Sequence, residues 1–434
     1  MNLPTDFMNK YKAILGSEAE VFFSSFDENA VSAFRVNPLK PVVKTYENPI
    51  PKTPWGYYGK ISGRSIDHVA GLVYSQEPAA QMVGQVAQPS PGMKVLDLAA
   101  APGGKSTHLL AYLNNTGLLV SNDISKKRSQ TLVENIERFG ARNVIVTNES
   151  AQRLANVFPD YFDMIVLDAP CSGEGMFRKD PAAMAYWHPN YPKECAELQK
   201  EILQDALKML KPGGVLVYST CTWSPEENEE VVQWLLDDYP LELEELPLLN
   251  GMTPGLGLSQ VARMYPHHFV GEGQFVARLR DTRPIGKEPR RKSPKSNLTQ
   301  EQKQLWHAFA KHHLITSLDG ILQTFGDHLY LLPNDLPDLR GIRIARNGLE
   351  LGTFKKKRFE PSFALGLALG PKDVNLSLAI DEEAFRKYVA GHSLKLGQTL
   401  PTDWYLVTVQ GLGIGFSKVV GDTLKNSFPK GLRF

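Results

Sequence analysis

The sequence predicts an α/β fold of the Rossmann-like type, with a doubly wound, mostly parallel sheet, and three observations support this prediction. Between residues 92 and 280, short apolar runs typical of strands alternate with segments of helical apolar spacing. A loop of small residues follows the first of these runs and leads into a helix. Polar motifs follow several other runs, and ligands of doubly wound sheets bind where the strands end.

The residue pattern predicts each element of this core in turn. Strands are expected where runs are continuously apolar: Lys94–Leu98, Leu118–Asn122, Val144–Thr147, Met164–Asp168, Val215–Ser219 and Phe275–Leu279. Helices are expected where apolar residues recur every three or four positions: Ser106–Leu113, Lys126–Phe139, Ala196–Leu210 and Pro225–Leu236. The last helix is predicted to start with a capping box, in which Ser224 is the N-cap and Glu227 the third helical residue.

Segments of different character flank this core, which is expected to span 89–282. Residues 1–88 are expected to form a separate N-terminal α+β region that binds RNA or has an accessory role. Residues 283–298 are rich in Pro, Lys and Arg and are expected to be a basic linker. The C-terminal region, 299–434, begins with a helix and continues in short strands such as Leu329–Leu332, Ile342–Ala345 and Trp404–Val409.

Composition indicates an ordinary globular protein, with 42% hydrophobic and 22% charged residues in a chain of 434. No run of about 18 apolar residues predicts a membrane helix, and the N-terminus lacks a signal-peptide pattern. Three cysteines cannot form a disulfide framework, which fits a reducing cytoplasm.

Residues 284–434 carry 22 Lys and Arg against 14 Asp and Glu, a net charge of +8, whereas the remainder carries −7. This asymmetry is consistent with a polyanionic partner or with a solvated basic surface.

The small-residue loop is a candidate cofactor site that comprises Ala99, Ala100, Ala101, Pro102, Gly103, Gly104 and Lys105. Such residues let the backbone approach a ligand closely. The loop matches neither the phosphate-binding GxxxxGK[ST] pattern nor the dinucleotide GxGxxG pattern. Asp123 follows the next strand, where a carboxylate can hold the two hydroxyls of a ribose. Loop and acid together predict an adenosine-type cofactor without phosphates, such as S-adenosylmethionine.

Two cysteines lie in short motifs after strands: Cys171 in Asp168-Ala-Pro-Cys171, and Cys221 in Ser219-Thr-Cys221. Methylases of exocyclic amines commonly have an aromatic residue at the position of Cys171, so this site favours a carbon target. Carbon 5 of cytosine becomes nucleophilic when a thiolate adds to carbon 6, which is covalent catalysis by cysteine. The base must leave any helical stack to be reached. A lone cysteine is more often a small core residue, but two at strand ends favour chemistry.

Other features are expected to have structural or weaker roles. Cys195 follows no strand and is expected to pack in the core. His267 and His268 lack companion ligands at metal spacing, so a surface loop is expected, and no metal site is predicted. The run Lys355-Lys-Lys-Arg358 fits phosphate contacts or a solvated face.

With these motifs the chain resembles the NOL/NOP/Sun family of RNA cytosine-5 methyltransferases over about Phe34 to Leu279. The stretch Gly173–Pro181 is most similar to the bacterial RsmF branch, and Gly413–Val419 resembles its PUA-like RNA-binding domain. The resemblance rests on these motifs: Arg35-Val-Asn37, Ala99-Ala-Ala-Pro-Gly-Gly-Lys105, Asn122-Asp-Ile124, Asp168-Ala-Pro-Cys-Ser-Gly173, Ser219-Thr-Cys221 and Gly273-Gln-Phe-Val-Ala277.

The resemblance implies roles for individual residues. Cys221 would be the nucleophile, Cys171 would assist product release, and Asp168 would contact the cytosine and lie near the cofactor. The loop Ala99 to Lys105 would line the methionine end of the cofactor, with Lys105 also counted as catalytic. Asp123 would hold the ribose, with Arg128 nearby. The family usually has an Asp near the adenine, and the matching position here is Ser150.

The sequence therefore predicts a cytoplasmic enzyme that uses S-adenosylmethionine to methylate carbon 5 of specific cytidines in RNA through a Cys221 adduct. Small-subunit ribosomal RNA is the expected substrate, and the chain is expected to be a monomer with no membrane partner. A tRNA substrate stays open because the catalytic motifs do not distinguish the RNAs. A non-catalytic RNA-binding ribosome assembly factor is the alternative without chemistry. A DNA cytosine methylase would usually have its nucleophile at the position of Cys171.

Overall fold

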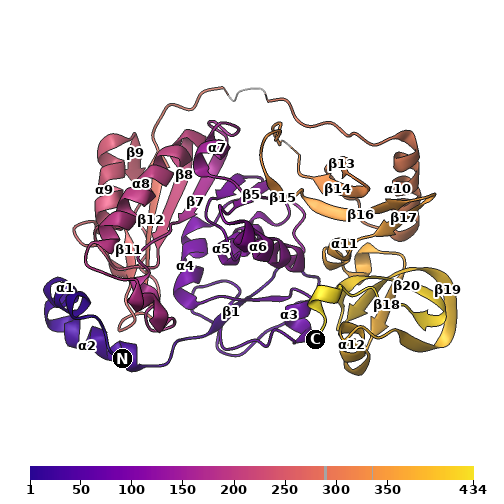
Figure 1. Ribbon diagram of the computed structural model, residues 1–434, viewed down its shortest axis with the longest axis horizontal. Coiled ribbons are helices and arrows are strands. Elements are labelled where there is room, and N and C mark those ends of the chain that lie inside the picture. The colour runs from indigo at the N-terminus through magenta and orange to yellow at the C-terminus, as the bar shows by residue number, and fades with distance from the viewer. Residues whose placement is uncertain (288–290, 335) are drawn as a thin grey trace.

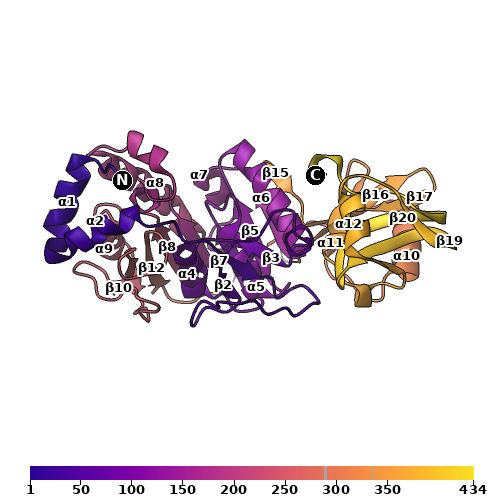
Figure 2. The same cartoon turned by 90° about the horizontal axis from the view of Figure 1, so that it is seen from below.

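The structure is a computed structural model that describes residues 1–287, 291–334 and 336–434 (Figures 1 and 2). Residues 288–290 of the predicted basic linker lie outside this described part. A ten-stranded mixed sheet forms the centre, in the order β10-β11-β12-β8-β7-β4-β5-β6-β15, with β9 paired to β12. The predicted α/β class is confirmed, although antiparallel strands flank the parallel core on both sides.

The parallel core matches the predicted strands closely. Its members in spatial order are β8 (Leu210–Thr220), β7 (Phe162–Asp168), β4 (Lys94–Asp97), β5 (Leu118–Asn122) and β6 (Val144–Thr147). The chain runs from β4 outward to β6 and then returns to β7 on the other side of β4. The strand order therefore reverses between β4 and β7, and the carboxyl ends of strands at such a reversal form a ligand crevice.

Helices cover both faces of this core (Figure 1). The strand residues alternate, so that Val95 packs with one face and Leu96 with the other. One apolar cluster includes residues of α4 (Pro78–Ala87), α5 (Gly104–Leu113) and α6 (Lys126–Phe139). The other includes residues of α7 (Ala151–Ala155), α8 (Tyr191–Met209) and α9 (Glu229–Asp238).

The predicted capping box at Ser224 is wrong, because α9 begins four residues later than expected. Residues 225–228 form turns before the helix, and Asn228 is its N-cap. The side chains that would have formed the box have other partners. Ser224 Oγ donates a hydrogen bond to Glu174 Oε1 at 2.8 Å, and Glu227 Oε2 accepts one from the Ser172 backbone at 2.9 Å.

Antiparallel strands extend the sheet at both edges. On one side lie β12 (Gln274–Asp281), β11 (Ala262–Met264), β10 (Thr253–Pro254) and β9 (Leu241–Leu243). On the other side β15 (Ile344–Arg346) pairs with β6, with Ile344 opposite Thr147. A strand was predicted at 342–345, but it belongs to the central sheet rather than to a C-terminal one.

The N-terminal region has two parts. Helices α1 (Thr5–Leu15) and α2 (Ala19–Ser24) lie at the end of the molecule away from the C-terminal sheets (Figure 2). A three-stranded sheet, β2 (Gly56–Tyr58), β1 (Ala33–Val36) and β3 (Val73–Ser75), follows with the short helix α3 (Ile66–Val69). The helices pack on loops of the central unit through an aromatic cluster: Phe7, Tyr11, Phe22, Phe26, Phe177, Trp187, Trp223 and Tyr265.

The C-terminal region contains two smaller sheets. The first consists of β13 (Ile321–Phe325), β14 (His328–Leu332), β16 (Leu349–Lys355) and β17 (Arg358–Pro361), next to α10 (Gln300–His313) and α11 (Phe363–Leu367). The second consists of β18 (Ser377–Ile380), β19 (Leu394–Val409) and β20 (Leu412–Leu424), with α12 (Glu382–Val389). The basic run Lys355–Arg358 forms the turn between β16 and β17.

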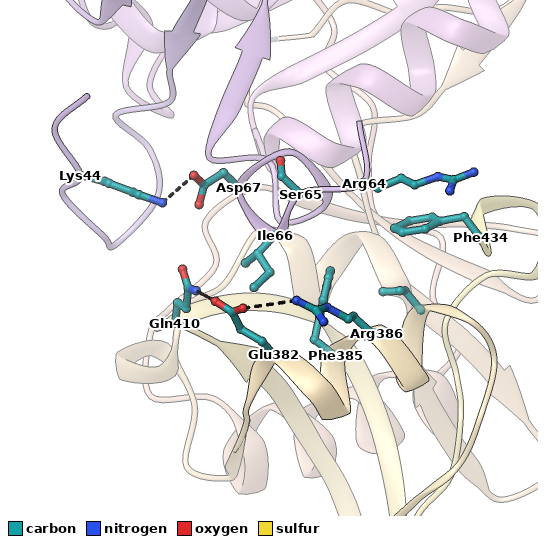
Figure 3. Close-up of a pocket in the computed structure, with 11 residues that line it drawn as sticks. Lys44, Arg64, Ser65, Ile66, Asp67, Glu382, Phe385, Arg386, Gln410 and Phe434 are labelled. Atoms are coloured by element: carbon teal, nitrogen blue, oxygen red, sulfur yellow. Dashed lines mark hydrogen bonds and ion pairs between the residues drawn. The ribbon is translucent and has the colours of Figure 1, made fainter. Parts of the chain in front are cut away.

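The N-terminal sheet and the last C-terminal sheet are in contact. They share one apolar cluster, which includes Phe34 and Val73 on one side and Phe385 and Val407 on the other. A cleft of about 450 Å³ opens beside this cluster, and Figure 3 shows that charged side chains from both regions line it. None of the helices in the described part of the chain is long and apolar enough to cross a membrane.

Candidate active site

A cavity of about 310 Å³ lies at the carboxyl ends of the parallel strands, where the strand order reverses. This volume is in the range of small-molecule sites. It brings together most of the residues that the sequence predicted, from five separate strand ends. The lining residues with predicted roles are Ala99, Ala101, Asp123, Arg128, Ser150, Asp168, Cys171 and Cys221.

The small-residue loop leaves β4 and enters α5 at one side of this cavity. Gly103 is the N-cap of α5 and has φ of 116°, a left-handed conformation that favours glycine. The loop is fixed from behind, since Arg35 Nη2 donates to the Gly104 carbonyl at 2.8 Å. Ser106 Oγ, one turn into the helix, donates to Asp97 Oδ2 at 2.6 Å. The loop is therefore anchored to the protein interior on the side away from the cavity.

Asp123 lies directly after β5 and is buried, at 2% exposure. Its carboxylate accepts hydrogen bonds from the backbone of Ser125 at 2.9 Å and of Ala101 at 3.3 Å. Arg128 Nη2 lies 3.6 Å from Asp123 Oδ2 and donates to the Ala101 carbonyl at 2.6 Å. The structure thus brings Asp123 and Arg128 to the small-residue loop, at the edge where the cavity is lined by Ile124.

Asp168 ends β7 and forms an ion pair with Lys105, with Oδ2 and Nζ 2.6 Å apart. Its other oxygen accepts hydrogen bonds from Ser219 Oγ at 2.7 Å and Gln274 Nε2 at 3.0 Å. Burial alone lowers the pKa of Lys105, but the Asp168 carboxylate outweighs it and raises that pKa above its usual value. Lys105 is therefore a firmly held cation at the same end of the cavity as the cysteines.

The sulfur atoms of Cys171 and Cys221 lie 3.3 Å apart, although the residues are 50 positions apart in the chain. Both cysteines are partly exposed, and both line the cavity. The hydrogen bond to Cys221 and then burial raise the pKa of the Cys171 thiol well above its usual value. This contact and burial therefore favour the protonated form of the Cys171 thiol.

Two buried glutamates support the cysteine loops, and sequence motifs had assigned them no such role. Glu174 accepts hydrogen bonds from Thr222 Oγ1 at 2.9 Å and Trp187 Nε1 at 3.0 Å. Glu227 holds the residue after Cys171 by accepting from the Ser172 backbone at 2.9 Å, and it also accepts from Gln199. The local sequence around the two glutamates did not predict this supporting role, because their hydrogen-bond partners come from separate loops.

Glu227→Gln is expected to change how stability depends on pH. Burial raises the pKa of Glu227 to about 7, although hydrogen bonds from Ser172 lower it. The folded protein therefore holds a proton that the unfolded chain releases above about pH 4.5, so stability falls as pH rises from 4.5 to 7. The variant should be more stable relative to wild type at pH 8 than at pH 5, by on the order of 1–3 kcal/mol. Urea unfolding at both pH values measures this, and equal differences at the two would contradict it.

The loop after β6 forms another wall of the cavity, at the position where the resemblance predicted the adenine. Ser150 lies there as predicted, but its hydroxyl accepts a hydrogen bond from the Arg153 backbone at 3.3 Å and caps α7. Glu149, for which no role was predicted, also lines the cavity, and its side chain is buried. Its carboxylate interacts with Arg343, which comes from the C-terminal region.

Two groups of metal-type side chains occur outside the cavity among the described residues. Glu18 Oε2 lies 2.8 Å from His268 Nε2 and 3.2 Å from His267 Nε2. His267 and His268 were predicted to lack companions, and Glu18 corrects this, since it comes from the distant N-terminal helices. Asp403 makes the second group with His312 and His313, at 2.8 Å each.

Cys195 lies on α8 and is buried, at 8% exposure, as predicted for a packing residue.

Comparison with known sequences covers almost the whole chain. The family model "16S rRNA methyltransferase RsmB/F" matches residues 85–280. Three more models match the flanks: the N-terminal domain of 16S rRNA methyltransferase RsmF over 3–78, the RsmF first C-terminal domain over 308–369, and the RsmF PUA domain over 375–434. The Ribosomal RNA small subunit methyltransferase F of Escherichia fergusonii is 35% identical over 382 residues, which are 85% of this chain and 80% of that protein.

Solved structures agree with these relatives. A methyltransferase homolog from Pyrococcus horikoshii has a TM-score of 0.56 and 32% identity, over 63% of this chain and 94% of its own. NSun6 from Pyrococcus horikoshii, solved with SFG, has a TM-score of 0.56 and 25% identity, over 65% of this chain and 99% of its own. The chain is therefore an S-adenosylmethionine-dependent methyltransferase. The chain belongs to the RsmB/F family of 16S rRNA methyltransferases, with the N-terminal and C-terminal domains of RsmF, and is an RNA methyltransferase.

Proposed function

We propose that this enzyme methylates carbon 5 of specific cytidines in small-subunit ribosomal RNA through a covalent bond between Cys221 and the base. The observation that carries the proposal is the 3.3 Å approach of two cysteine sulfurs at the edge of the cofactor cavity. A neighbouring carboxylate, Asp168, completes the group of side chains that this chemistry requires. Relatives named Ribosomal RNA small subunit methyltransferase F favour the ribosomal substrate over tRNA.

The residues around the cavity suit S-adenosylmethionine. The loop Ala99, Ala100, Ala101, Pro102, Gly103, Gly104 and Lys105 would line its methionine end, while Asp123 would accept hydrogen bonds from the ribose and Arg128 would close that side. Asp123 is buried and faces the cavity, so a ligand that brings hydroxyl donors satisfies its carboxylate. When bound, this cofactor supplies an electrophilic methyl group on a positively charged sulfur.

Cys221 begins the reaction by adding its thiolate to carbon 6 of the cytosine, which makes carbon 5 nucleophilic. This addition puts a negative charge on the ring, so Asp168 would pass a proton from Lys105 to the ring nitrogen beside the amino group, and that proton returns when the product forms. The 2.6 Å ion pair of Asp168 with Lys105 orients the carboxylate at the cavity edge. Carbon 5 then takes the methyl group, and the target base must be unstacked for the sulfur to reach it.

Release needs two bonds to break. The proton on carbon 5 leaves to a base, and the electron pair of that bond restores the ring double bond as the carbon 6–sulfur bond breaks. The sulfur of Cys221 departs as a thiolate. The Cys171 thiol, which keeps its proton, lies 3.3 Å from that sulfur and assists its departure by donating a hydrogen bond.

RNA would be held by the regions on either side of the catalytic domain. The proposed division is an N-terminal region over 1–88, a catalytic domain over 89–282, a basic linker over 283–298, and a C-terminal RNA-binding region over 299–434. The net charge of +8 over residues 284–434 supports contacts with phosphates. The enzyme would act in the cytoplasm as a monomer that needs no metal.

Asp123→Asn is expected to weaken S-adenosylmethionine binding by about tenfold to a hundredfold, because the amide removes the charge and one acceptor oxygen. Isothermal titration of the purified variant with S-adenosylhomocysteine measures this. Asp237→Asn, an exposed position on α9, is the matched control and should bind as wild type does. Equal affinity of Asp123→Asn and wild type would remove Asp123 from the ribose site.

The proposal is tested by incubating the enzyme with purified small-subunit rRNA, assembled small subunits and tRNA in separate reactions. Nuclease digestion and mass spectrometry then identify the methylated nucleoside. The proposal predicts 5-methylcytidine from a ribosomal substrate. Methylation of tRNA alone would keep the chemistry and change the substrate, and a methylated adenosine or guanosine would overturn the proposal.

A further inference from the structure

The adenine side of the cavity is supported by a residue from outside the catalytic domain. The loop Asn148–Ser150 follows β6 and leads into α7, and Glu149 and Ser150 both line the cavity. Ser150 stands where relatives of this family usually have an acid. The Ser150 hydroxyl caps α7, and the neighbouring Glu149 brings a carboxylate to this wall.

Glu149 is fully buried yet charged, and Arg343 provides most of its hydrogen bonds. The Arg343 backbone N–H donates to Glu149 Oε1 at 2.9 Å. Its guanidinium donates from Nε to Oε1 at 3.3 Å and from Nη2 to Oε2 at 3.2 Å. Arg153 adds an ion pair at 3.4 Å. Burial raises the pKa of Glu149, but the hydrogen bonds and charges of the two arginines outweigh it and lower that pKa below its usual value.

Arg343 is held in place by the edge of the central sheet. The Asn148 backbone donates to the Arg343 carbonyl at 2.9 Å, directly before the β15–β6 pairing. Three residues further on, Arg346 is buried and donates to the carbonyls of Val144 and Ala141. The segment 343–346 is therefore bound to β6 and to the loop after it by backbone hydrogen bonds and by the side chains of Arg343 and Arg346.

These contacts matter because a buried carboxylate that loses hydrogen-bond partners destabilises the folded state. Without the Arg343 guanidinium, Glu149 would keep the backbone N–H of residue 343 and the Arg153 ion pair but lose the hydrogen bonds from Nε and Nη2 that fix its two oxygens. The carboxylate could then rotate, which changes the wall against which the adenosine end of the cofactor would lie. The Glu149 backbone N–H and carbonyl are both hydrogen-bonded to Asn122, another residue of the cavity, so any displacement of Glu149 would also affect a second part of the cavity wall.

We infer that Arg343, a residue of the C-terminal region, is a positioning residue for S-adenosylmethionine, because it holds Glu149 and the loop 148–150 in the shape that receives the adenosine. The inference rests on the cofactor orientation proposed above. It also means that the C-terminal region contributes to cofactor affinity in addition to any contact with RNA.

The test compares Arg343→Ala with Arg340→Ala in the full-length protein. Arg340 lies three residues earlier in the same segment, is 92% exposed and pairs only with Asp338 among the described residues, so it is a matched control. Isothermal titration with S-adenosylhomocysteine should show that Arg343→Ala binds at least about fivefold more weakly than wild type, as expected for losing hydrogen bonds to a buried charge. Arg340→Ala should bind as wild type does. The KM for S-adenosylmethionine should rise in Arg343→Ala while kcat at saturating cofactor is retained, and Arg343→Lys should restore part of the affinity.

Hydrogen exchange supplies a second readout that general instability would not imitate. Since coupling between sites is reciprocal, S-adenosylhomocysteine should slow exchange in the segment 339–348 of the wild type and slow it less in Arg343→Ala. Unchanged affinity in Arg343→Ala, with wild-type binding intact, would overturn this inference alone. A wild-type protein that binds S-adenosylhomocysteine with no protection of either 148–150 or 339–348 would overturn the cofactor orientation as well.

Discussion

Cys221→Ala is expected to abolish methyl transfer to RNA, by about a thousandfold or more, while leaving the affinity for S-adenosylhomocysteine close to that of wild type. The thiolate of Cys221 is proposed to make carbon 5 of cytosine nucleophilic, and no other described thiol except Cys171 lines the cavity. Single-turnover transfer of labelled methyl groups measures the effect. Cys195→Ala, a packing cysteine on α8, is the control and should keep its activity.

The opposite pattern would reassign the nucleophile. If Cys171→Ala lost all reaction with RNA while Cys221→Ala retained turnover, the attacking thiol would be Cys171, as in most DNA cytosine methylases. The raised pKa of the Cys171 thiol argues against this outcome, because a thiol that keeps its proton is a poor nucleophile.

Cys171→Ala is expected to accumulate a covalent complex between protein and RNA. The variant keeps Cys221 for the attack but lacks the S–H that lies 3.3 Å from the departing sulfur, so release slows more than addition. Denaturing gel electrophoresis of the variant with substrate RNA should show a slowly migrating band that contains both molecules. Its amount should increase with S-adenosylmethionine, since methylation commits the adduct to the release step.

The double variant Cys171→Ala with Cys221→Ala controls for other crosslinks and should form no such band. A band of equal strength in the double variant would mean that some other residue holds the RNA. If Cys171→Ala turned over normally and formed no band, the role of Cys171 in release would be wrong.

Much of the catalytic core could be predicted because its signals are local. The strands β5 and β6 and the helix α6 match their predicted bounds, since continuous apolar runs and helical spacing are properties of neighbouring residues. The same holds for the site. Asp168 ends a strand, and Asp123, Cys171 and Cys221 lie within three residues after one, and parallel strands bring such residues to one edge.

The remaining features depend on contacts between distant segments. A strand was predicted at 342–345 without a pairing partner, and the observed strand at 344–346 pairs with β6, about 200 residues earlier. Ser224 and Glu227 match the sequence pattern of a capping box, but their side chains form hydrogen bonds with Glu174 and Ser172 instead. Glu149 lies in no sequence motif, and its proposed role depends on Arg343, a residue far away in the sequence. Local patterns do not record which buried partner a polar side chain will find.

The central claim is that this chain methylates carbon 5 of a cytidine in small-subunit ribosomal RNA by means of Cys221. Bisulfite sequencing of total RNA tests it most directly, in a strain that lacks the gene and in the same strain complemented with wild type or Cys221→Ala. The account predicts that at least one protected cytidine in small-subunit rRNA is lost with the gene, restored by wild type and not restored by Cys221→Ala. Unchanged protection of every ribosomal cytidine in the deletion strain would contradict it.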